Sequence, residues 1–214
     1  MMKAFIDTNI LLDVLGRREP HYEDAAQIWT LAETGKLEAY VSAISFTNVF
    51  YIVRKFRDLR AAKQAVKWMR DVFHIAACDD RILHQAIDAN WRDLEDAVQY
   101  FSAWRVDASC IVSRNVGDYA KSEMDVLSPE EFLAILYIVQ EGMYSLGNTL
   151  SEDELNRLVA TLTPLKQKIV QGLRDGQSVS QIASMTGRTC RSIHHNIHAI
   201  REEFANRGTD KGAT

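Results

Sequence analysis

The chain has 214 residues and a net charge of −4, and 47% of its residues are apolar and 25% charged. With only 10 Gly and 3 Pro, this is the composition of a folded globular protein, and it excludes collagen-like and low-complexity chains. The cysteines Cys78, Cys110 and Cys190 lie far apart, which argues against a disulfide framework or a cysteine-built zinc site and fits a reducing compartment. Asp7 interrupts the first apolar stretch, which argues against the apolar core of a signal peptide. The apolar run 132–139 is far shorter than the roughly 20 residues that span a membrane. We therefore expect a cytoplasmic protein without a membrane partner.

Apolar segments of strand length alternate with helix-like segments through the first two thirds of the chain. The helix-like segment 93–104 places Leu94, Ala97, Val98 and Phe101 on one face. Strands separated by helices of this length pair in parallel, so the pattern predicts an α/β fold with a parallel sheet. The expected strands are 3–7, 39–43, 72–77, 109–112 and 125–127. The other expected helices are one that begins near Asn9 and those at 21–36, 46–53, 79–88 and 128–136.

The composition changes after residue 139. Capping signals at Ser151, Thr163, Ser178 and Thr189 predict the starts of four helices. Residues 1–140 carry 16 basic and 21 acidic side chains, whereas residues 161–207 carry 7 and 3, so a small basic module follows an acidic body. We divide the chain into a first domain at 1–139, a linker at 140–150, a helical domain at 151–206 and a disordered tail at 207–214.

Acidic residues distant in the sequence are expected to meet at one edge of the sheet. Asp7 ends the first strand, Asp118 follows the fourth, and Asp96 lies on the helix before that strand. The carboxyl ends of parallel strands face one edge, where ligands bind. Two unit charges roughly 4 Å apart repel by about 4 kcal/mol at an effective dielectric constant of about 20. Such a cluster must take up protons, stay hydrated or hold a cation, and oxygen ligands favour Mg²⁺ or Mn²⁺.

Each acidic residue also has a purely structural interpretation. Asp93 is a natural N-cap, and Asp96 three residues later completes a capping-like pair. Asp118 is compatible with an ordinary turn. Asp7 is harder to explain in this way, because a carboxylate at the end of an apolar strand needs a partner or an ion.

Five segments of the chain carry a resemblance to a known family: AFIDTNILLDVL (4–15), VSAISFTNVFYIVRK (41–55), DLEDAVQY (93–100), CIVSRNVGDY (110–119) and VLSPEEFL (126–133). With these segments in family order, residues 2–138 resemble PIN domains, in particular the VapC-like endoribonuclease toxins of prokaryotes. The resemblance implies a sandwich of helices about a parallel sheet, an acidic site that holds Mg²⁺ or Mn²⁺, and cleavage of RNA.

By this resemblance, Asp7, Asp96 and Asp118 match the catalytic and metal-binding carboxylates of the family. Asn9 is similar to the residue that steadies the site through hydrogen bonds, and Ser113 stands where Thr or Ser is expected, in a position to orient water or a ligand.

Two positions depart from the family pattern. Asn48 replaces an expected Glu, and Asn115 stands where an acidic residue is often found. Both changes remove a negative charge and keep an oxygen, so we expect weaker metal binding or a single ion. Asp93 is positioned to compensate in part.

The C-terminal segment 162–204 resembles the DNA-binding domain of LuxR-type regulators and the last region of sigma factors. GQSVSQIASMTG (176–187) is the best-matching piece. A short helix, a tight turn and a polar helix are typical of a helix-turn-helix. His194 stands where those regulators often carry Lys, so binding should strengthen below about pH 6.5. The alternative is a helical bundle for dimerisation or antitoxin contact. The resemblance places five residues at the major groove or its phosphates: Arg191, Ser192, His194, His195 and Asn196.

Two functions are consistent with these observations. The first is a metal-dependent ribonuclease toxin with a fused helix-turn-helix that binds DNA; family precedent implies a homodimer and a protein antitoxin. In this enzyme water attacks the phosphorus of RNA and a 3′-hydroxyl leaves. The second is a DNA-binding transcriptional regulator whose PIN-like half is weak or inactive because of Asn48 and Asn115.

Overall fold

The computed structural model describes residues 2–139 and 152–209, although some side chains within 137–139 and the C-terminal helices are not described. Its sheet has five parallel strands in the order β3-β2-β1-β4-β5. The predicted parallel α/β sheet is therefore confirmed. The strands are β1 (Lys3–Ile6), β2 (Glu38–Ser42), β3 (His74–Ala76), β4 (Cys110–Val112) and β5 (Asp125–Leu127).

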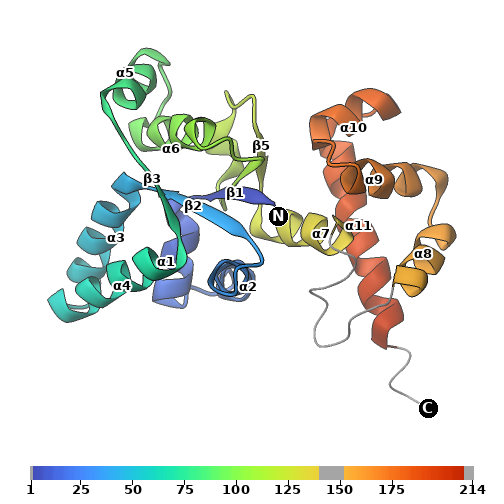
Figure 1. Cartoon of the computed structure of the whole chain (residues 1–214), viewed down its shortest axis with the longest axis horizontal. Coiled ribbons are helices and arrows are strands. Elements are labelled where there is room, and N and C mark those ends of the chain that lie inside the picture. The colour runs from blue at the N-terminus through green and yellow to red at the C-terminus, as the bar shows by residue number, and fades with distance from the viewer. Residues whose placement is uncertain (1, 140–151, 210–214) are drawn as a thin grey trace. The chain divides into compact units, whose positions relative to one another are not determined.

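Helices cover both faces of this sheet (Figure 1). Helices α1 to α4 lie on one side, and α5 and α6 lie on the other, where α6 packs against β2, β3 and β4. The helices of this part are α1 (Thr8–Gly16), α2 (Tyr22–Glu33), α3 (Ala43–Phe56), α4 (Leu59–Val72), α5 (Asp80–Asp88) and α6 (Leu94–Arg105), and a 3-10 helix, η1 (Val116–Tyr119), follows β4.

Two features of this part differ from the sequence-based expectation. Helix α4 was not predicted, because its buried face consists mainly of Ala62, Ala65 and Met69, and alanines give a weak apolar signal. Leu94 was placed on the buried face of α6 with Ala97, but its side chain is 51% exposed. Leu94 is the first residue of α6, so it lies beyond the part of the helix that packs on the sheet.

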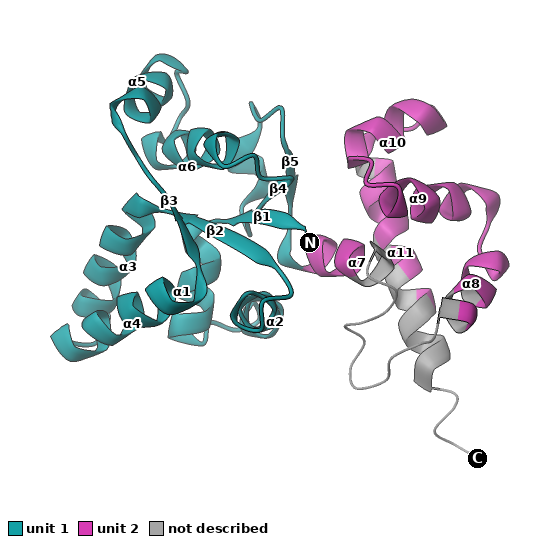
Figure 2. Ribbon diagram, viewed as in Figure 1, with its two compact units in different colours: residues 1–129 teal, residues 130–214 magenta. Residues whose placement is uncertain are grey.

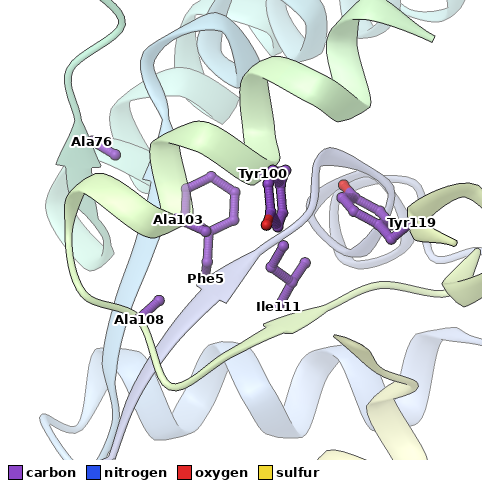
Figure 3. Packing of buried hydrophobic residues seen from close by; sticks show 7 residues of the cluster. All are labelled: Phe5, Ala76, Tyr100, Ala103, Ala108, Ile111 and Tyr119. Atoms are coloured by element: carbon purple, nitrogen blue, oxygen red, sulfur yellow. The ribbon is translucent and has the colours of Figure 1, made fainter. Parts of the chain in front are cut away.

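Large side chains from β1, β4 and α6 form the core on one side of the sheet (Figure 3). Phe5 and Ile111 project from neighbouring strands and are fully buried. Tyr100 and Ala103 from α6 pack over them, and Tyr119 from η1 closes the cluster. The cluster therefore joins the elements that also deliver the acidic residues.

The chain divides into two compact units, residues 1–129 and residues 130–214 (Figure 2). This division lies ten residues before the predicted domain boundary at 139, because α7 (Pro129–Val139) groups with the second unit. The predicted linker at 140–150 lies outside the described residues. The predicted disordered tail began at residue 207, but the last helix, α11 (Cys190–Thr209), includes residues 207–209. The rest of that tail is not described.

Helices are the only regular secondary structure among the described residues of the second unit. Ser178 and Gln181 form the predicted capping box at the start of the third of its last four helices, with bonds of 2.8 and 3.2 Å. Gly187 ends that helix with φ of 65°, a left-handed conformation that favours glycine. A methyl group on Gly172 would lie 2.8 Å from Ile182 Cγ1, so glycine permits the close approach of two helices there. The last four helices are α8 (Glu152–Thr161), α9 (Pro164–Arg174), α10 (Val179–Thr186) and α11 (Cys190–Thr209).

Among the described residues, no helix is both long enough and apolar enough to cross a membrane.

A cavity-creating substitution tests the central position of Ile111. Ile111→Ala should lower the free energy of unfolding of the first unit by about 2 to 5 kcal/mol, because the residue is fully buried between β1 and α6. Denaturant unfolding followed by tryptophan fluorescence measures this unit, since all of the tryptophans lie within residues 29–104. Ile87→Ala, at a side chain that is 62% exposed, is the matched control and should change the stability by less than about 0.5 kcal/mol. Equal losses in the two variants would contradict this description of the core.

Candidate active site

The site begins where the strand order of the sheet reverses. The chain passes from β1 outward to β2 and β3, and then returns to the other side of β1 as β4. Ligands of open α/β sheets bind in the crevice at such a point, outside the carboxyl ends of the strands. Here Ile6 pairs with Val112, and the Asp7 amide donates a 3.0 Å hydrogen bond to the Val112 carbonyl oxygen. The register therefore brings Asp7 and Ser113 side by side at the crevice.

Asp7 is buried and held by several hydrogen bonds. Its Oδ2 accepts hydrogen bonds from Ser113 Oγ at 2.6 Å and from Asn9 Nδ2 at 2.7 Å. Its Oδ1 accepts one from Gln99 Nε2 at 3.0 Å and a longer one from the Asn9 amide at 3.3 Å. Burial raises the pKa of Asp7, and the hydrogen bonds from Ser113 and Gln99 oppose this effect. The Asp7 carboxylate is thus fixed in position at the cost of desolvation.

Asn9 and Ser113 connect Asp7 to the segment after β4. Asn9 Nδ2 also donates to Ser113 Oγ at 3.0 Å, and Asn9 Oδ1 accepts from the Arg114 amide at 3.2 Å. The Asn115 amide donates to Ser113 Oγ at 3.0 Å. Both side chains thus hold the start of α1 against the end of β4. The resemblance implied such a steadying role for Asn9, whereas Ser113 was expected to orient water or a ligand.

Four supporting residues were not predicted. Gln99 is almost fully buried, and while its Nε2 serves Asp7, its Oε1 accepts a 3.2 Å hydrogen bond from the Thr8 amide. Thr8 Oγ1 lies 2.9 Å from Ser45 Oγ and donates to Glu95 Oε1 at 3.1 Å. A signal for Gln99 was present in the sequence: it lies three residues after Asp96, and residues at this spacing share a helix face.

Asp96 is the most perturbed carboxyl group of the cleft. It is half-buried, and its pKa is raised to about 7 by burial first and then by the negative charges of Asp7, Asp93 and Asp118. Within residues 2–139 and 152–209, its side chain forms no ion pair and no hydrogen bond. Its electrostatic neighbours are therefore other carboxylates.

A cleft of about 490 Å³ brings together the acidic residues predicted for the site. Asp93 lines it and also caps α6, accepting a 2.7 Å hydrogen bond from the Glu95 amide, as its structural interpretation predicted. Asp118 lies exposed on η1. Ser113 is not part of the lining and reaches the site through its hydrogen bond to Asp7. The predicted residues that line the cleft are Asp7, Asn9, Asn48, Asp93, Asp96, Asn115 and Asp118.

Two arginines also line this cleft, and both face another acid. Arg114 Nη1 lies 2.9 Å from Asp13 Oδ1, and Arg18 Nη1 lies 3.9 Å from the same atom. Asp13 is fully buried, so its carboxylate depends on these cations for compensation. Burial raises the pKa of Asp13, and the charge of Arg114 opposes this effect. The positive charge of the arginines therefore compensates Asp13 rather than Asp96.

The donor set of the cleft matches Mg²⁺ or Mn²⁺ in kind. Carboxylate and amide oxygens are the ligands that these hard cations select. In the part of the chain that the structure describes, no three acidic, histidine or cysteine side chains already converge as a metal cage. The unpaired carboxylate of Asp96 supports a cation partner, and the close hydrogen bonds at Asp7 show that only part of its acceptor capacity is open.

The residues predicted to contact DNA lie at the start of α11. Asn196 Nδ2 donates to the Ser192 carbonyl oxygen at 2.7 Å, and His195 is exposed. His194 Nδ1 lies 2.8 Å from Glu131 Oε1, so an acidic side chain already occupies one of its ring nitrogens. The side chain of Arg191 is not described. These residues lie close together at the start of α11, and all of them belong to the second unit.

Comparisons with known proteins agree with the expected family. Residues 3–117 match the sequence model of the family described as PIN domain. Ribonuclease VapC1 of Aquifex aeolicus is 27% identical over 135 residues, which cover 61% of this chain and 92% of that protein. Among solved structures, VapBC2 from Rickettsia felis bound to a DNA fragment from its promoter gives a TM-score of 0.48 at 12% identity, covering 59% of this chain and 98% of that one. A toxin–antitoxin complex from Klebsiella pneumoniae gives 0.45 at 22% identity, covering 59% and 97%.

The raised pKa of Asp96 predicts a pH-dependent cost to stability. Because its folded pKa lies near 7 and above the ordinary value, the folded state favours the protonated acid; this stabilisation is present at low pH and is lost as the pH rises through about 7. Asp96→Asn cannot ionise, so in EDTA it should melt above the parent chain near pH 8 and close to it near pH 4. Thermal unfolding across this range measures the difference, with Asp88→Asn at an exposed position as the control. A gap that stays constant with pH would exclude Asp96 as its source.

Proposed function

The chain belongs to the PIN-domain family, and on this premise we propose that it is a metal-dependent endoribonuclease, the toxin of a toxin–antitoxin pair. The observation that carries this proposal is the carboxyl group of Asp96, half-buried among Asp7, Asp93 and Asp118 without a cation partner in the described residues. The similarity to a protein named Ribonuclease VapC1 supports RNA as the substrate class.

In this proposal, Asp7, Asp96 and Asp118 hold Mg²⁺ or Mn²⁺. When bound, the dication offsets charge on the scissile phosphodiester and lowers the pKa of a water molecule. Asp7 contributes a carboxylate whose orientation is set by Ser113 and Gln99, so its position does not depend on the ion. Water attacks phosphorus, and the 3′-hydroxyl is the leaving group.

Asn48 and Asn115 limit the negative charge of the cleft. Both line it with amide side chains where the family pattern favours carboxylates. An amide oxygen binds a dication without adding charge, so the proposed site holds its ion more weakly than a site with five acids, or holds a single ion. This property affects catalytic strength and leaves the fold unchanged.

Metal binding and RNA cleavage should be lost together when Asp7 is replaced. Mn²⁺ should raise the melting temperature of the parent chain and not that of Asp7→Ala, because ligand binding to the folded state stabilises it. The same variant should leave RNA uncut in Mn²⁺, and EDTA should inhibit the parent chain. Ser113→Ala, which removes the 2.6 Å hydrogen bond to Asp7, should lower cleavage by about 10 to 100-fold.

Asp88→Asn, at an exposed residue outside the cleft, controls for a general loss of charge and should retain both properties. Equal stabilisation of the Asp7→Ala variant and the parent chain by Mn²⁺ would contradict the role of Asp7.

The antitoxin and the homodimer are part of the same proposal. The resemblance to VapC-like toxins, together with 27% identity to a protein named Ribonuclease VapC1, supports a protein antitoxin for this chain. Family precedent supports a dimer of two copies. A short open reading frame beside the gene would favour such a pair.

The second unit supports an additional function in DNA binding. Helices α10 and α11 are joined by the three residues Gly187 to Thr189, and a turn of this length with a glycine is typical of a helix-turn-helix. Thr189 Oγ1 accepts a 3.2 Å hydrogen bond from the Ser192 amide and so stabilises the start of α11. In this proposal Arg191, Ser192, His195 and Asn196 face DNA, and His194 contributes less because it contacts Glu131.

Two alternatives use the same helices. In the first, the chain is a transcriptional regulator whose first unit is catalytically weak. In the second, the helices form a bundle for dimerisation or antitoxin contact. RNA cleavage by the parent chain excludes the first alternative, and binding of the parent chain to duplex DNA favours the helix-turn-helix over the second.

Substitution of Arg191 tests the DNA-binding proposal. Arg191→Ala should weaken binding to duplex DNA and reduce the slope of log affinity against log salt by about 1, because one phosphate contact is lost. Fluorescence anisotropy over a range of salt concentrations measures both quantities. Lys168→Ala removes one exposed positive charge from α9 and is the matched control, which should keep the parent slope. Equal effects of the two substitutions would contradict groove binding by α11.

A further inference from the structure

Three adjoining cavities extend from the acidic cleft along the first unit. A second cavity of about 530 Å³ shares Asp93, Asp96 and Asp118 with the cleft. A third, of about 800 Å³, shares Trp91 and Lys121 with the second. The shared lining residues show that each cavity lies next to the following one. We call the third cavity the aromatic groove; the residues that matter here are Arg81, Trp91, Phe101, Trp104, Arg105 and Lys121.

Aromatic rings of this groove continue inward to the acidic residues. Trp91 contacts Tyr100 at 5.0 Å and Tyr119 at 5.9 Å between ring centroids, and Tyr100 contacts Trp104 at 6.4 Å. Tyr100 and Tyr119 belong to the buried core cluster (Figure 3), so the outer rings rest on a rigid support. Tyr119 directly follows Asp118 on η1, so the inner end of this row of rings lies next to the acidic site.

The outer rings are partly exposed to solvent. The Trp104 side chain is 50% exposed although it is one of the largest apolar groups of the chain, and Trp91 and Phe101 are partly buried. An exposed tryptophan at the mouth of a cavity, held by packing underneath, is suited to stacking on a planar ring.

The groove also differs in charge from the body around it. Its lining has three cations, Arg81, Arg105 and Lys121, and one acid, Glu123, within a part of the chain where acids outnumber bases. Arg105 Nη1 pairs with Asp79 Oδ2 at 2.9 Å, so its charge is compensated. Lys121 Nζ donates to the Asn90 carbonyl oxygen, which holds this cation in place without neutralising it. Arg81 has no ion pair among the residues that the structure describes.

The acidic cleft makes such a surface necessary for an RNA substrate. Carboxylates repel phosphates, so the affinity for RNA must come from cations and stacking outside the cleft. Basic grooves with aromatic side chains bind single-stranded nucleic acid in this way, because every base offers a ring face and every nucleotide a negative charge. A polypeptide partner would gain from the apolar rings but would not require the positive charge.

We propose that single-stranded RNA lies along the aromatic groove, with bases stacked on Trp104 and Trp91 and phosphates facing Arg81 and Lys121, so that the strand leads to Asp96 and Asp118. This inference rests on the proposed function of the cleft as a ribonuclease site. It assigns the binding energy of the substrate to a surface beyond the residues that perform the chemistry.

Equilibrium binding tests the groove without cleavage. The full chain in EDTA is titrated into a fluorescent single-stranded RNA of about ten nucleotides, with excess unlabelled duplex DNA present to occupy the second unit. Trp104→Ala should weaken binding about tenfold, and Arg81→Ala should weaken it and flatten the salt dependence. Trp104→Phe, which retains an aromatic face, should bind nearly as well as the parent chain. Trp68→Ala on α4, where the side chain is 52% exposed, is the matched control and should bind like the parent.

Cleavage in Mn²⁺ separates this inference from the proposed function. Trp104→Ala should raise the KM for long RNA and leave kcat unchanged. If the parent chain cuts RNA but Trp104→Ala binds and cuts like the parent, the groove proposal is wrong and the nuclease stands. If Trp104→Ala loses RNA affinity but the parent cuts no RNA, the groove binds RNA and the nuclease proposal fails. Unchanged RNA affinity with altered self-association in ultracentrifugation would overturn the proposal in favour of a protein-contact surface.

Discussion

Repulsion between carboxylates in a half-buried cleft is the constraint on which the rest of this structure depends. Asp96 lies half-buried among Asp7, Asp93 and Asp118, and its pKa is raised to about 7 by burial first and then by their negative charges. A protein keeps such a cost only where folding supplies compensation or function requires the charge. The described structure supplies hydrogen bonds to Asp7 but no ion pair to Asp96. A dication bound in the cleft would therefore supply the positive charge that the carboxylate of Asp96 lacks.

The sheet topology explains why these residues meet. The order β3-β2-β1-β4-β5 puts the ends of β1 and β4 side by side, and the pairing of Ile6 with Val112 sets Asp7 next to Ser113. Helix α6 then carries Asp96 and Gln99 on one face over the same edge. The cations of this unit are divided between two roles. Arg18 and Arg114 compensate Asp13, and Arg105 pairs with Asp79. Arg81 and Lys121 of the aromatic groove form no ion pair among the described residues and are available to a polyanion.

Local signals in the sequence were sufficient for the sheet and for the acidic residues, because strand ends and helix starts are encoded by nearby residues. The capping box of Ser178 and Gln181 was predictable for the same reason. Contacts between distant segments were not predictable in this way. His194 contacts Glu131, 63 residues away, and Trp91 contacts Tyr119 only because tertiary packing brings them together. Helix α4 was missed because alanines form much of its buried face, and the exposure of Leu94 depends on where α6 leaves the sheet. Gln99 could have been found from its spacing to Asp96.

Locating a bound Mn²⁺ ion tests the central claim most directly. Crystals of the full chain soaked in Mn²⁺ and measured at its absorption edge would show the ion as an anomalous peak. The account predicts a peak in the cleft within coordination distance of carboxylate oxygens of Asp96 and at least one of Asp7 and Asp118. A peak elsewhere, or Asp96 bound to a lysine or arginine with no ion in the cleft, would contradict it.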